Sequence, residues 1–313
     1  MTTMVHRLNR FLLPLTCIAA LTAAPALASA KPLVGISDNS AAMFGNSWFT
    51  RLNLPIARIM VDWNTAVMKN KSELHATQAW VAAALADKVQ PMISFTGDTH
   101  TTSSYVPTTS QYTSAIQAFL KAVPQVKTYS PWNEPDWIYR PHLSNNPALA
   151  ASYFNALIRY CHGCTIVAGD VYRQTSDGLG SWLKAYARHL GARPKAWALH
   201  NYYDVREHNT RQLQALYNAV HPRQIWLTEI SGVERRGHWQ FRNQSPNAAN
   251  RDEQFLFSLP KRFHSITRIY HYQWQAVQSV GWDSGLLGPQ GKPRPAYWTL
   301  ANYVGPHKTR DHR

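Results

Sequence analysis

Two glutamates stand at the ends of hydrophobic, strand-like runs, and they are the residues of this 313-residue chain best suited to chemistry. Glu134 lies in Trp-Asn-Glu-Pro-Asp at 132–136, and Glu229 lies in Ile-Trp-Leu-Thr-Glu-Ile-Ser at 225–231. Cleavage of a glycosidic bond needs two carboxyl groups, one that donates a proton and one that attacks the sugar or activates water. A single glutamate at a strand end is more often a salt-bridge partner or a helix cap, so the interpretation depends on what accompanies the pair.

Short apolar runs rich in β-branched residues alternate with segments of helical spacing, and these elements must position the two glutamates. The expected strands cover residues 33–36, 57–61, 91–95, 126–130, 165–169, 196–200, 224–228 and 268–274. The expected helices cover residues 74–85, 112–123, 148–160, 181–190, 212–220 and 250–257, and 295–300 would open a last helix. Eight such units, with no glycine-rich phosphate loop after the first strand, predict an α/β fold: a single (β/α)8 TIM barrel rather than a doubly wound sheet. Glu134 and Glu229 would close strands four and seven, at the end of the barrel where catalytic side chains gather.

Residues 1–30 have the pattern of a secretory signal peptide, with two arginines, an apolar stretch to about residue 21, and Ala-Ser-Ala at 28–30. We expect the mature chain to begin at Lys31, with one catalytic domain over 31–305 and a basic, disordered tail over 306–313. The apolar stretch is shorter than the roughly 20 residues of a membrane span. The mature protein is therefore expected outside the cell, in the periplasm or at the cell wall, with no membrane partner.

The chain is strongly basic, with 32 Lys and Arg against 17 Asp and Glu and a formal net charge of +15, of which the signal peptide contributes two arginines. These residues are scattered rather than clustered, so the charge favours an anionic glycan as partner and does not indicate nucleic-acid binding. Twelve Trp and fifteen Tyr suit stacking on sugar rings, although many of them must fill the core. We expect a monomer that needs no cofactor and no metal.

Cys161 and Cys164, in Cys-His-Gly-Cys, are the two cysteines that remain after the signal peptide. An even pair in an exported chain predicts a short disulfide. A zinc site would need four ligands, of which only His162 is added nearby, and a redox role would need a thioredoxin-like context that is missing. We therefore expect a disulfide at the end of a helix, just before the strand at 165–169.

Other predicted strand ends add groups that suit a sugar site. Arg58, in the second strand, could hold a carboxylate ionised, and Asn133 places an amide beside Glu134. His200 and Tyr202 follow the sixth strand in His-Asn-Tyr, where alternate residues of an extended chain point the same way.

Two aromatic residues complete this set. Tyr202 would donate a hydrogen bond to Glu229 and so keep it oriented. Trp274, in the eighth strand, would offer a flat apolar face to a pyranose ring.

This ordered set resembles the clan A glycoside hydrolases, and the likeness spans most of the mature chain. It rests on Trp132-Asn133-Glu134-Pro135, His200-Asn201-Tyr202, Leu227-Thr228-Glu229, Arg58 and Trp274. The Trp-Asn-Glu-Pro-Asp phrase looks most like families 39 and 128. The resemblance implies a retaining barrel enzyme with Glu134 as acid/base, Glu229 as nucleophile, and Asn133 binding the hydroxyl next to the anomeric carbon. Tyr202 would support Glu229, while Arg58, His200 and Trp274 would complete the sugar subsite.

The mechanism expected from the pair is a double displacement. Glu134 donates a proton to the leaving oxygen while Glu229 attacks the anomeric carbon, and water then releases the sugar with its configuration retained. The two carboxyl groups should then lie roughly 5 to 5.5 Å apart, whereas about 6.5 to 9.5 Å would indicate inversion.

Further residues at the predicted mouth of the barrel are candidates for substrate contact, each with a structural alternative. Tryptophans are more often packing residues than sugar platforms, and an aspartate in a loop can simply cap a turn. These candidates are Trp63, Asp98, His100, Trp137, Tyr172, Trp282 and Asp283.

Two other classes of protein remain as alternatives. A non-catalytic carbohydrate- or cell-wall-binding protein on a barrel scaffold would keep the aromatic residues but need not keep both glutamates. A secreted basic adhesin for cell wall or nucleic acid would account for the charge but not for the ordered strand-end residues, and its binding would weaken steeply with salt. The intact pair favours a glycosidase acting on a polysaccharide or oligosaccharide.

Overall fold

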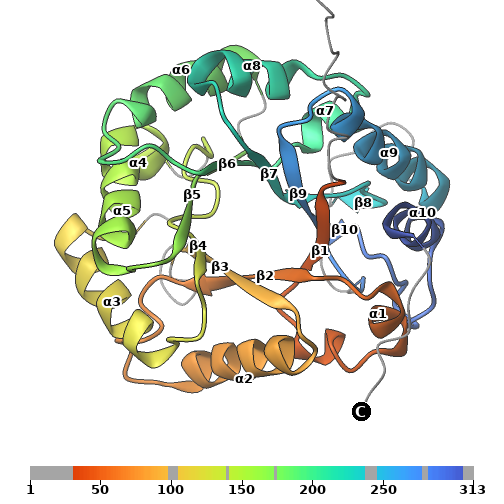
Figure 1. Ribbon diagram of the computed structural model, residues 1–313, viewed down its shortest axis with the longest axis horizontal. Coiled ribbons are helices and arrows are strands. Elements are labelled where there is room, and N and C mark those ends of the chain that lie inside the picture. Colours follow the sequence, from red (N-terminus) through yellow and green to blue (C-terminus); the bar gives the residue numbers. More distant parts are fainter. Residues whose placement is uncertain are drawn as a thin grey trace, which may run out of the picture. The chain divides into compact units, whose positions relative to one another are not determined.

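Eight parallel strands close into a barrel in the order β1-β2-β3-β4-β5-β6-β7-β9, with helices around the outside (Figure 1). The computed structural model describes residues 31–97, 105–138, 141–172, 175–236, 245–276 and 281–305, which all fall in one compact unit. The barrel strands are β1 (Leu33–Ser37), β2 (Ile56–Asp62), β3 (Gln90–Thr96), β4 (Thr128–Ser130), β5 (Thr165–Val171), β6 (Ala196–Leu199), β7 (Ile225–Ile230) and β9 (Ile266–Tyr272). β9 pairs in parallel with both β7 and β1, which closes the circle. The predicted (β/α)8 barrel is confirmed.

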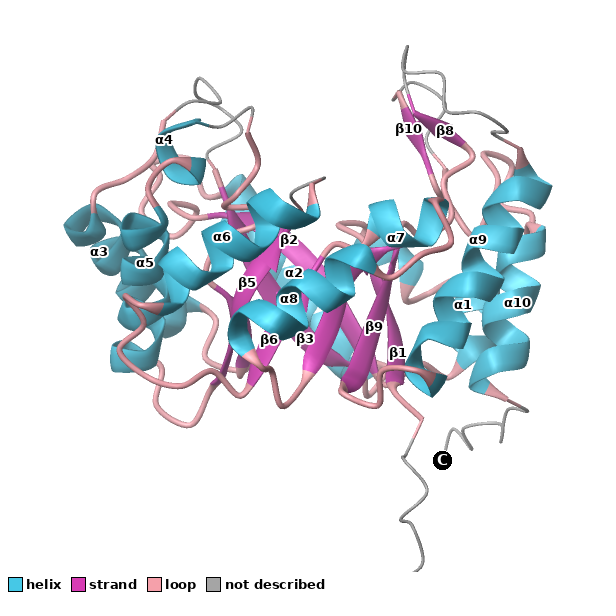
Figure 2. Cartoon of the chain, turned by 90° about the horizontal axis from the view of Figure 1, so that it is seen from above, coloured by secondary structure: helices cyan, strands magenta, loops and turns pink. Residues whose placement is uncertain are grey.

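The helices alternate with the strands along the chain (Figure 2). They are α1 (Ser47–Leu52), α2 (Ser72–Ala86), α3 (Thr109–Ala122), α4 (Pro141–Ser144), α5 (Pro147–Tyr160), α6 (Ser176–Ala187), α7 (Tyr202–Arg206), α8 (Arg211–Val220), α9 (Pro246–Ser258) and α10 (Pro295–Val304). Two 3-10 turns, η1 (Ala41–Met43) and η2 (Leu259–Lys261), and a small antiparallel sheet of β8 (Arg235–Arg236) with β10 (Trp282–Asp283) complete the described elements. Among the described residues, none of the helices is long and apolar enough to cross a bilayer. The predicted signal peptide and tail lie outside the described residues.

Capping residues explain why several helices begin earlier than their apolar spacing suggests. Thr108 accepts a hydrogen bond from the backbone N–H of Gln111, whose side chain accepts one from the N–H of Thr108, so α3 starts at Thr109. The start of α6 contains Gly178 and Gly180, which have low helix propensity. The sequence therefore did not predict that the helix begins before residue 181.

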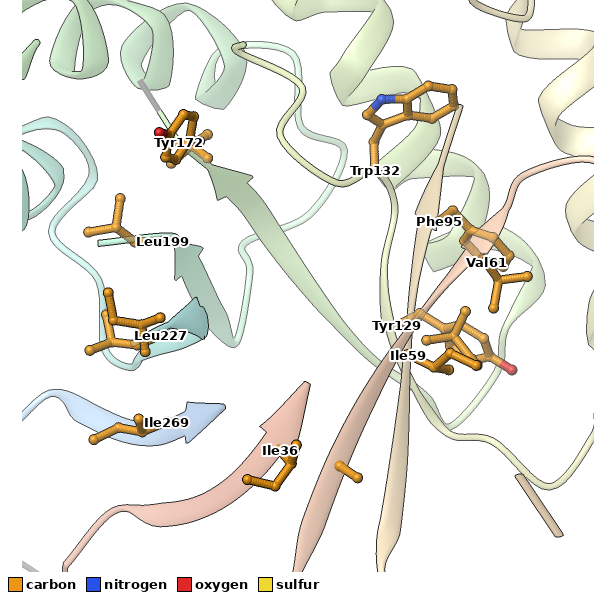
Figure 3. Packing of buried hydrophobic residues seen from close by; sticks show 14 of the residues in the cluster. Ile36, Ile59, Val61, Phe95, Tyr129, Trp132, Tyr172, Leu199, Leu227 and Ile269 are labelled. Atoms are coloured by element: carbon orange, nitrogen blue, oxygen red, sulfur yellow. The ribbon is translucent and has the colours of Figure 1, made fainter. Parts of the chain in front are cut away.

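Outward-facing side chains of the strands pack against the helices and form the main core (Figure 3). The labelled residues Ile36, Ile59, Val61, Leu199, Leu227 and Ile269 all belong to this layer. Because successive residues of a strand point to opposite faces, their neighbours in sequence point into the barrel. The apolar residues on the outer face of each strand therefore determine which residues face the interior of the barrel.

A disulfide joins Cys161 to Cys164, with 5.5 Å between their Cα atoms. Cys161 ends α5, and Gly163 between the two cysteines has a φ of +76°, a conformation that glycine adopts without steric cost. The short bridge thus lies in the turn between α5 and β5, on the side of the barrel opposite the strand ends that carry the glutamates.

Candidate active site

The interior of the barrel changes from apolar to polar toward the carboxyl ends of the strands. A separate cluster draws buried residues from β2, β3, β5, β6, β7 and β9, as only inward-facing positions can: Ile56, Met92, Val167, Ala196, Ala198, Trp226 and Tyr270. Two residues further along five of these strands, on the same face, stand Arg58, Ser94, His200, Thr228 and Tyr272. This polar layer lies where barrel enzymes carry their catalytic groups.

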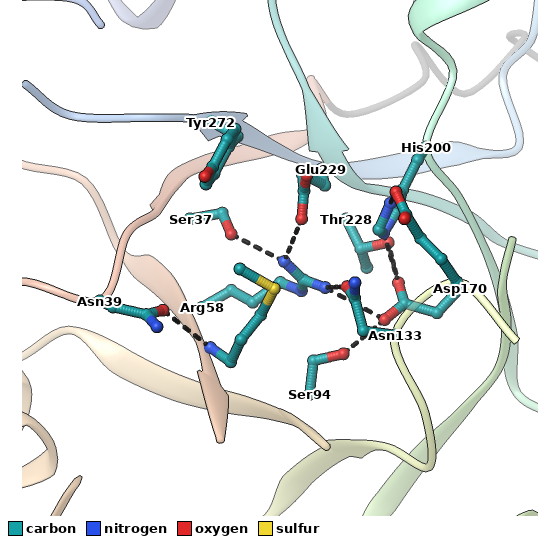
Figure 4. A network of polar contacts seen from close by, with 12 residues as sticks. Ser37, Asn39, Arg58, Ser94, Asn133, Asp170, His200, Thr228, Glu229 and Tyr272 are labelled. Atoms are coloured by element: carbon teal, nitrogen blue, oxygen red, sulfur yellow. Dashed lines mark hydrogen bonds and ion pairs between the residues drawn. The ribbon is translucent and has the colours of Figure 1, made fainter. Parts of the chain in front are cut away.

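Arg58 is the centre of the polar network (Figure 4). Its guanidinium is fully buried and donates from one terminal nitrogen to Ser37 at 2.8 Å and to Glu229 Oε2 at 2.9 Å. The other terminal nitrogen donates to Asn133 Oδ1 and to Asp170 Oδ2, the latter at 3.2 Å. Burial alone would lower the pKa of Arg58, but the charges of Asp170 and Glu229 raise it above its ordinary value. Arg58 thus pairs with a carboxylate, as the sequence suggested, and it also fixes the orientation of Asn133.

Asp170 is a member of the network that the sequence did not predict. It is fully buried and accepts hydrogen bonds from Ser94 at 2.5 Å, from Thr228, and from Arg58. Burial would raise its pKa, but Arg58 and His200 hold the pKa of Asp170 well below its usual range. The carboxylate therefore stays ionised and balances the two cationic side chains beside it.

A β-bulge explains why Asp170 points inward. Strict alternation from Val167 would place Asp170 on the outer face, but the register with β6 shifts by one residue between Gly169 and Val171. Asp170 has a φ of +62°, in the left-handed region that non-glycine residues rarely adopt. A glycine inside a strand, followed by an aspartate, was the available signal for this bulge.

A second register shift, between Leu227 and Ile230 of β7, has the same effect on Glu229. Thr228 reaches Asp170 inside the barrel, and the extra residue lets Glu229 face the interior as well. β7 therefore supplies two adjacent side chains to one site.

His200 connects Asp170 to Glu134. Its Nε2 lies 3.0 Å from Asp170 Oδ1 and its Nδ1 lies 3.0 Å from Glu134 Oε1. Burial opposes the charged form of His200, but Glu229 and Asp170 raise the pKa of His200 to about 10. At neutral pH both ring nitrogens therefore carry protons, and the imidazolium donates to Asp170 Oδ1 and to Glu134 Oε1.

The two glutamates face each other across this layer. One side-chain oxygen or nitrogen from each of Glu134, His200 and Glu229 lies within 4.8 Å of the others. Glu134 has a φ of +51°, and its backbone N–H donates to the carbonyl of Asp170 at 2.9 Å, which fixes the turn after β4. Three such groups can hold a metal ion, but both ring nitrogens of His200 are already paired with carboxyl oxygens, at 3.0 Å each. The geometry suits a pair of carboxyl groups that act directly on a substrate.

Two tyrosines flank Glu229. Tyr202, the first residue of α7, donates from its hydroxyl to Glu229 Oε1 at 3.3 Å, as the sequence predicted. Tyr272, the last residue of β9, stands beside Glu229 (Figure 4). Burial, and next the charge of Glu229, raise the pKa of Tyr272, so its hydroxyl keeps its proton.

Trp274 is not where we expected it. β9 ends at Tyr272, so Trp274 lies beyond the strand. Trp274 is 2% exposed, and its ring makes T-shaped contacts with Phe49 and Tyr297. Almost no face of the Trp274 ring is left free to stack on a sugar, although part of this residue lines a cavity at the ends of β1 and β9. The aromatic residue that β9 brings to the glutamates is Tyr272. The sequence did not identify it because the predicted strand, 268–274, ends two residues too late.

The remaining aromatic candidates lie at varying depth. Trp63 is 6% exposed and stacks on Tyr105, with 6.4 Å between ring centroids, and Trp137 is a partly buried residue packed on the main core. Tyr172 and Trp282 both meet Tyr202 edge-on, at 6.1 and 5.1 Å between centroids. Trp282, in β10, and Tyr172 thus both contact the tyrosine that donates to Glu229.

Asp283 has a structural role. Its two oxygens accept from both terminal nitrogens of Arg294, at 2.6 and 2.9 Å, and one also accepts from the N–H of Gly285 at 3.2 Å. The predicted alternative, an aspartate that caps a turn, agrees with these contacts. Asp98 and His100 lie outside the described residues.

The raised pKa of His200 predicts a loss of stability in alkaline solution. Because the pKa rises from 6.5 in the unfolded chain to about 10 in the folded one, the stabilisation is complete below about pH 6.5 and disappears as the pH rises through 10. The free energy of unfolding should fall by on the order of 2–4 kcal/mol across this window. Urea unfolding at pH 6, 8 and 10 measures the loss, with His200→Gln as the reference that lacks the group. Equal pH dependence in the two proteins would contradict the assignment.

A parallel barrel whose carboxyl end carries two glutamates within reach of one another defines a class of protein, the glycoside hydrolases. Comparison of the sequence with protein families agrees. The chain belongs to the family described as Glycosyl hydrolase catalytic core, whose profile matches residues 60–299. A comparison with curated proteins found no match.

Solved structures of clan A glycoside hydrolases share the fold. A family 10 endoxylanase retrieved from a sugarcane soil metagenome is similar with a TM-score of 0.62 and 11% identity, over 88% of this chain and 97% of the other. A mutant family 128 (subgroup I) endo-β-1,3-glucanase from Amycolatopsis mediterranei, in complex with laminaripentaose, has a TM-score of 0.57 and 16% identity over 87% and 99%. XacCel5A in complex with cellopentaose has a TM-score of 0.60 and 14% identity over 88% and 100%. These likenesses show that the chain has the same barrel fold.

Proposed function

We propose that this glycoside hydrolase is exported and cleaves the O-glycosidic bonds of a polysaccharide or oligosaccharide with retention of configuration. The observation that carries the proposal is the short distance between the glutamates, of which two side-chain oxygens lie within 4.8 Å of each other. Retaining enzymes keep their carboxyl groups roughly 5 to 5.5 Å apart, whereas inverting enzymes leave about 6.5 to 9.5 Å for a water molecule.

The surroundings of the two glutamates support different roles. Glu229 receives hydrogen bonds on both oxygens, from Arg58 and from Tyr202, and its side chain is 10% exposed. Such donors stabilise a carboxylate in a fixed orientation, as a nucleophile requires. The side chain of Glu134 is 17% exposed, and within the part of the chain that the structure describes it pairs with His200. This exposure suits a group that exchanges protons with a leaving group and with water.

The first step breaks the bond between the anomeric carbon and the leaving oxygen. Protonated His200 donates from Nδ1 to Glu134 Oε1, which leaves Oε2 to carry the proton that the leaving oxygen takes. Glu229 attacks the anomeric carbon at the same time and forms a glycosyl ester, while its negative charge passes to Glu134.

The second step returns both glutamates to their starting state. Glu134, now ionised, takes a proton from a water molecule, whose oxygen attacks the anomeric carbon and breaks the ester to Glu229. Asn133, held by Arg58, lies beside Glu134 and is placed to bind the hydroxyl next to the anomeric carbon. Tyr272 is the aromatic group that we assign to the sugar unit at the cleavage point.

Export as a monomer to the cell exterior, periplasm or cell wall is part of the proposal and is supported by the signal-like pattern of residues 1–30. The alternative, a non-catalytic carbohydrate-binding protein, would not require Arg58 and Tyr202 to converge on Glu229.

A mechanism-based label tests the retaining mechanism. A 2-deoxy-2-fluoro glycoside with an activated leaving group should form a stable ester on Glu229, which peptide mass spectrometry would locate. Proton NMR of the first product formed should show the starting anomeric configuration, and Glu229→Gln should not be labelled. A first product of inverted configuration, or an ester on another residue, would overturn the retaining mechanism with Glu229 as nucleophile. If no glycan gave either a label or a product, the alternative of a non-catalytic carbohydrate-binding protein would be favoured.

A further inference from the structure

A cavity of about 710 Å³ lies beside the glutamates, at the carboxyl ends of β1 and β9. Its described walls come from the segment that follows β1, through η1 to the start of α1, and from the segments around residues 273–276 and 289–290. Its volume lies within the roughly 300–1,000 Å³ of ligand-binding pockets. None of the roles assigned above to the catalytic residues requires this space.

Two of the residues that line the cavity directly follow residues of the polar network in sequence. Ser37 binds Arg58 at 2.8 Å, and the next residue, Asp38, lines the cavity. On the other side, Tyr272 faces Glu229, and the next residue, Gln273, lines the cavity. The charges of both Glu229 and Asp38 act on the hydroxyl of Tyr272. A chain of sugar units bound at the glutamates would therefore extend past Tyr272 into this space.

The lining is rich in carboxamides. Asn46, Gln273, Gln275 and Gln290 all contribute, together with the carboxylate of Asp38. A carboxamide both donates and accepts hydrogen bonds, and a sugar hydroxyl does the same, so the two kinds of group pair well. Asn46 already accepts from the N–H of Trp48 through Oδ1, so its amide nitrogen is the atom that it can offer to a hydroxyl. This composition matches a glycan better than it matches an apolar ligand.

Several of these groups are fixed in place by the protein. Asp38 accepts from the backbone N–H of Ser40 at 2.8 Å and of Trp274 at 2.9 Å, which ties the end of β1 to the end of β9. Gln275 donates through Nε2 to the carbonyl of Pro289 at 3.3 Å, which leaves its side-chain oxygen as an acceptor. A preformed wall of this kind binds without ordering its own side chains.

The charge of the lining runs against the charge of the whole chain. Among the described residues that line the cavity, Asp38 is the one ionisable group, and no Lys, Arg or His is present. A uronic acid here would meet the carboxyl group of Asp38 and would find no Lys, Arg or His among these lining residues to balance its own charge. The basic residues that give the chain its net charge of +15 are therefore absent from the described lining of the cavity.

We propose that this cavity binds uncharged sugar units of the substrate, adjacent to the unit held between Glu134 and Glu229, and discriminates against acidic sugars. The proposal rests on the proposed glycosidase function and names the class of its substrate: a neutral polysaccharide or oligosaccharide. It replaces the anionic glycan that the net charge favoured.

Blocking the cavity tests the proposal. Ala42 is an exposed residue of its wall, so Ala42→Trp should fill the space without disturbing the core. Its matched control is Ala79→Trp, at an exposed position on α2. Gln290→Ala, also exposed, is a second variant that removes a carboxamide without adding bulk.

Binding is measured first, by calorimetry in a Glu229→Gln background. The probes are laminaripentaose, cellopentaose, xylopentaose, mannopentaose and, as the acidic probe, pentagalacturonic acid. We expect at least one neutral pentasaccharide to bind, with affinity reduced about tenfold or more by Ala42→Trp, less by Gln290→Ala, and not at all by Ala79→Trp. A tenfold change corresponds to about 1.4 kcal/mol, a modest share of one sugar unit's contacts.

Cleavage is measured next, in the background that keeps Glu229. Ala42→Trp should lower kcat/KM for the same pentasaccharide about tenfold but leave an aryl monoglycoside, which is too short to reach the cavity, unchanged. Tighter binding of pentagalacturonic acid, no binding of any neutral probe, or equal behaviour of Ala42→Trp and Ala79→Trp would overturn the proposal. Neutral binding that Ala42→Trp weakens, with no cleavage by the wild type, would uphold the cavity and refute the catalytic function.

Discussion

Replacing Glu134 with Ala is expected to lower kcat/KM on a natural glycan by about 10² to 10⁴, the usual contribution of a general acid. The loss should depend on the leaving group. A dinitrophenyl glycoside needs no protonation to leave, so its first step should be nearly unaffected. Azide, which fits the space of the missing carboxylate and needs no general base, should restore turnover and give a glycosyl azide with retained configuration.

Steady-state kinetics on the two substrates, with and without azide, measure these effects. Glu207→Ala is the matched control, because this glutamate is exposed and pairs with Arg206 on the surface. Equal losses on both substrates, or a glycosyl azide of inverted configuration, would show that Glu134 is not the acid/base group.

Replacing Asp170 with Asn should lower both activity and stability, although this residue does not touch the substrate. The variant leaves Arg58 and His200 without the buried charge that balances them. Breaking a buried ion pair in this way costs about 3–5 kcal/mol. The pKa of His200 should fall toward its ordinary value, so His200 would lose its positive charge near neutral pH. Glu134 would then lose its charged hydrogen-bond donor. We expect a decrease in kcat of roughly 10²-fold.

A pH profile separates this positioning role from simple destabilisation. The alkaline limb of kcat should move to lower pH in Asp170→Asn, because His200 now titrates earlier. Asp204→Asn is the control: Asp204 is equally buried but caps α8 through the N–H groups of Gln212 and Leu213. It should lower the melting temperature and leave the limb in place. A limb that stays in place in Asp170→Asn would refute the positioning role.

The barrel and most of its site could be predicted from the sequence because both depend on local patterns. Each strand is a short apolar run, and the outer residues that make it apolar determine which residues face inward. Glu134, Arg58 and His200 stand at or near the ends of such runs, so the fold brings them together. Glu229 also ends such a run, and the register shift in β7 turns it toward Arg58.

The sequence failed where the chain departs from regular alternation. Asp170 faces inward only because one extra residue shifts the register of β5, and no count of alternating residues shows that. Trp274 was taken for the aromatic residue of the last strand because the apolar run continues past Tyr272, where the strand in fact ends. Helix α7 was missed because it has five residues, too few for a helical period to show.

The left-handed backbone at Glu134 and Asp170 has a consequence for protein engineering. Each of these residues bears roughly 1–3 kcal/mol of conformational strain that a glycine would not. A library screened for heat resistance alone would therefore tend to reward glycine at position 134, where the side chain contributes little to packing, and would enrich inactive barrels. Selection for a sturdier catalyst from this scaffold should hold positions 134 and 170 constant and seek its gains elsewhere.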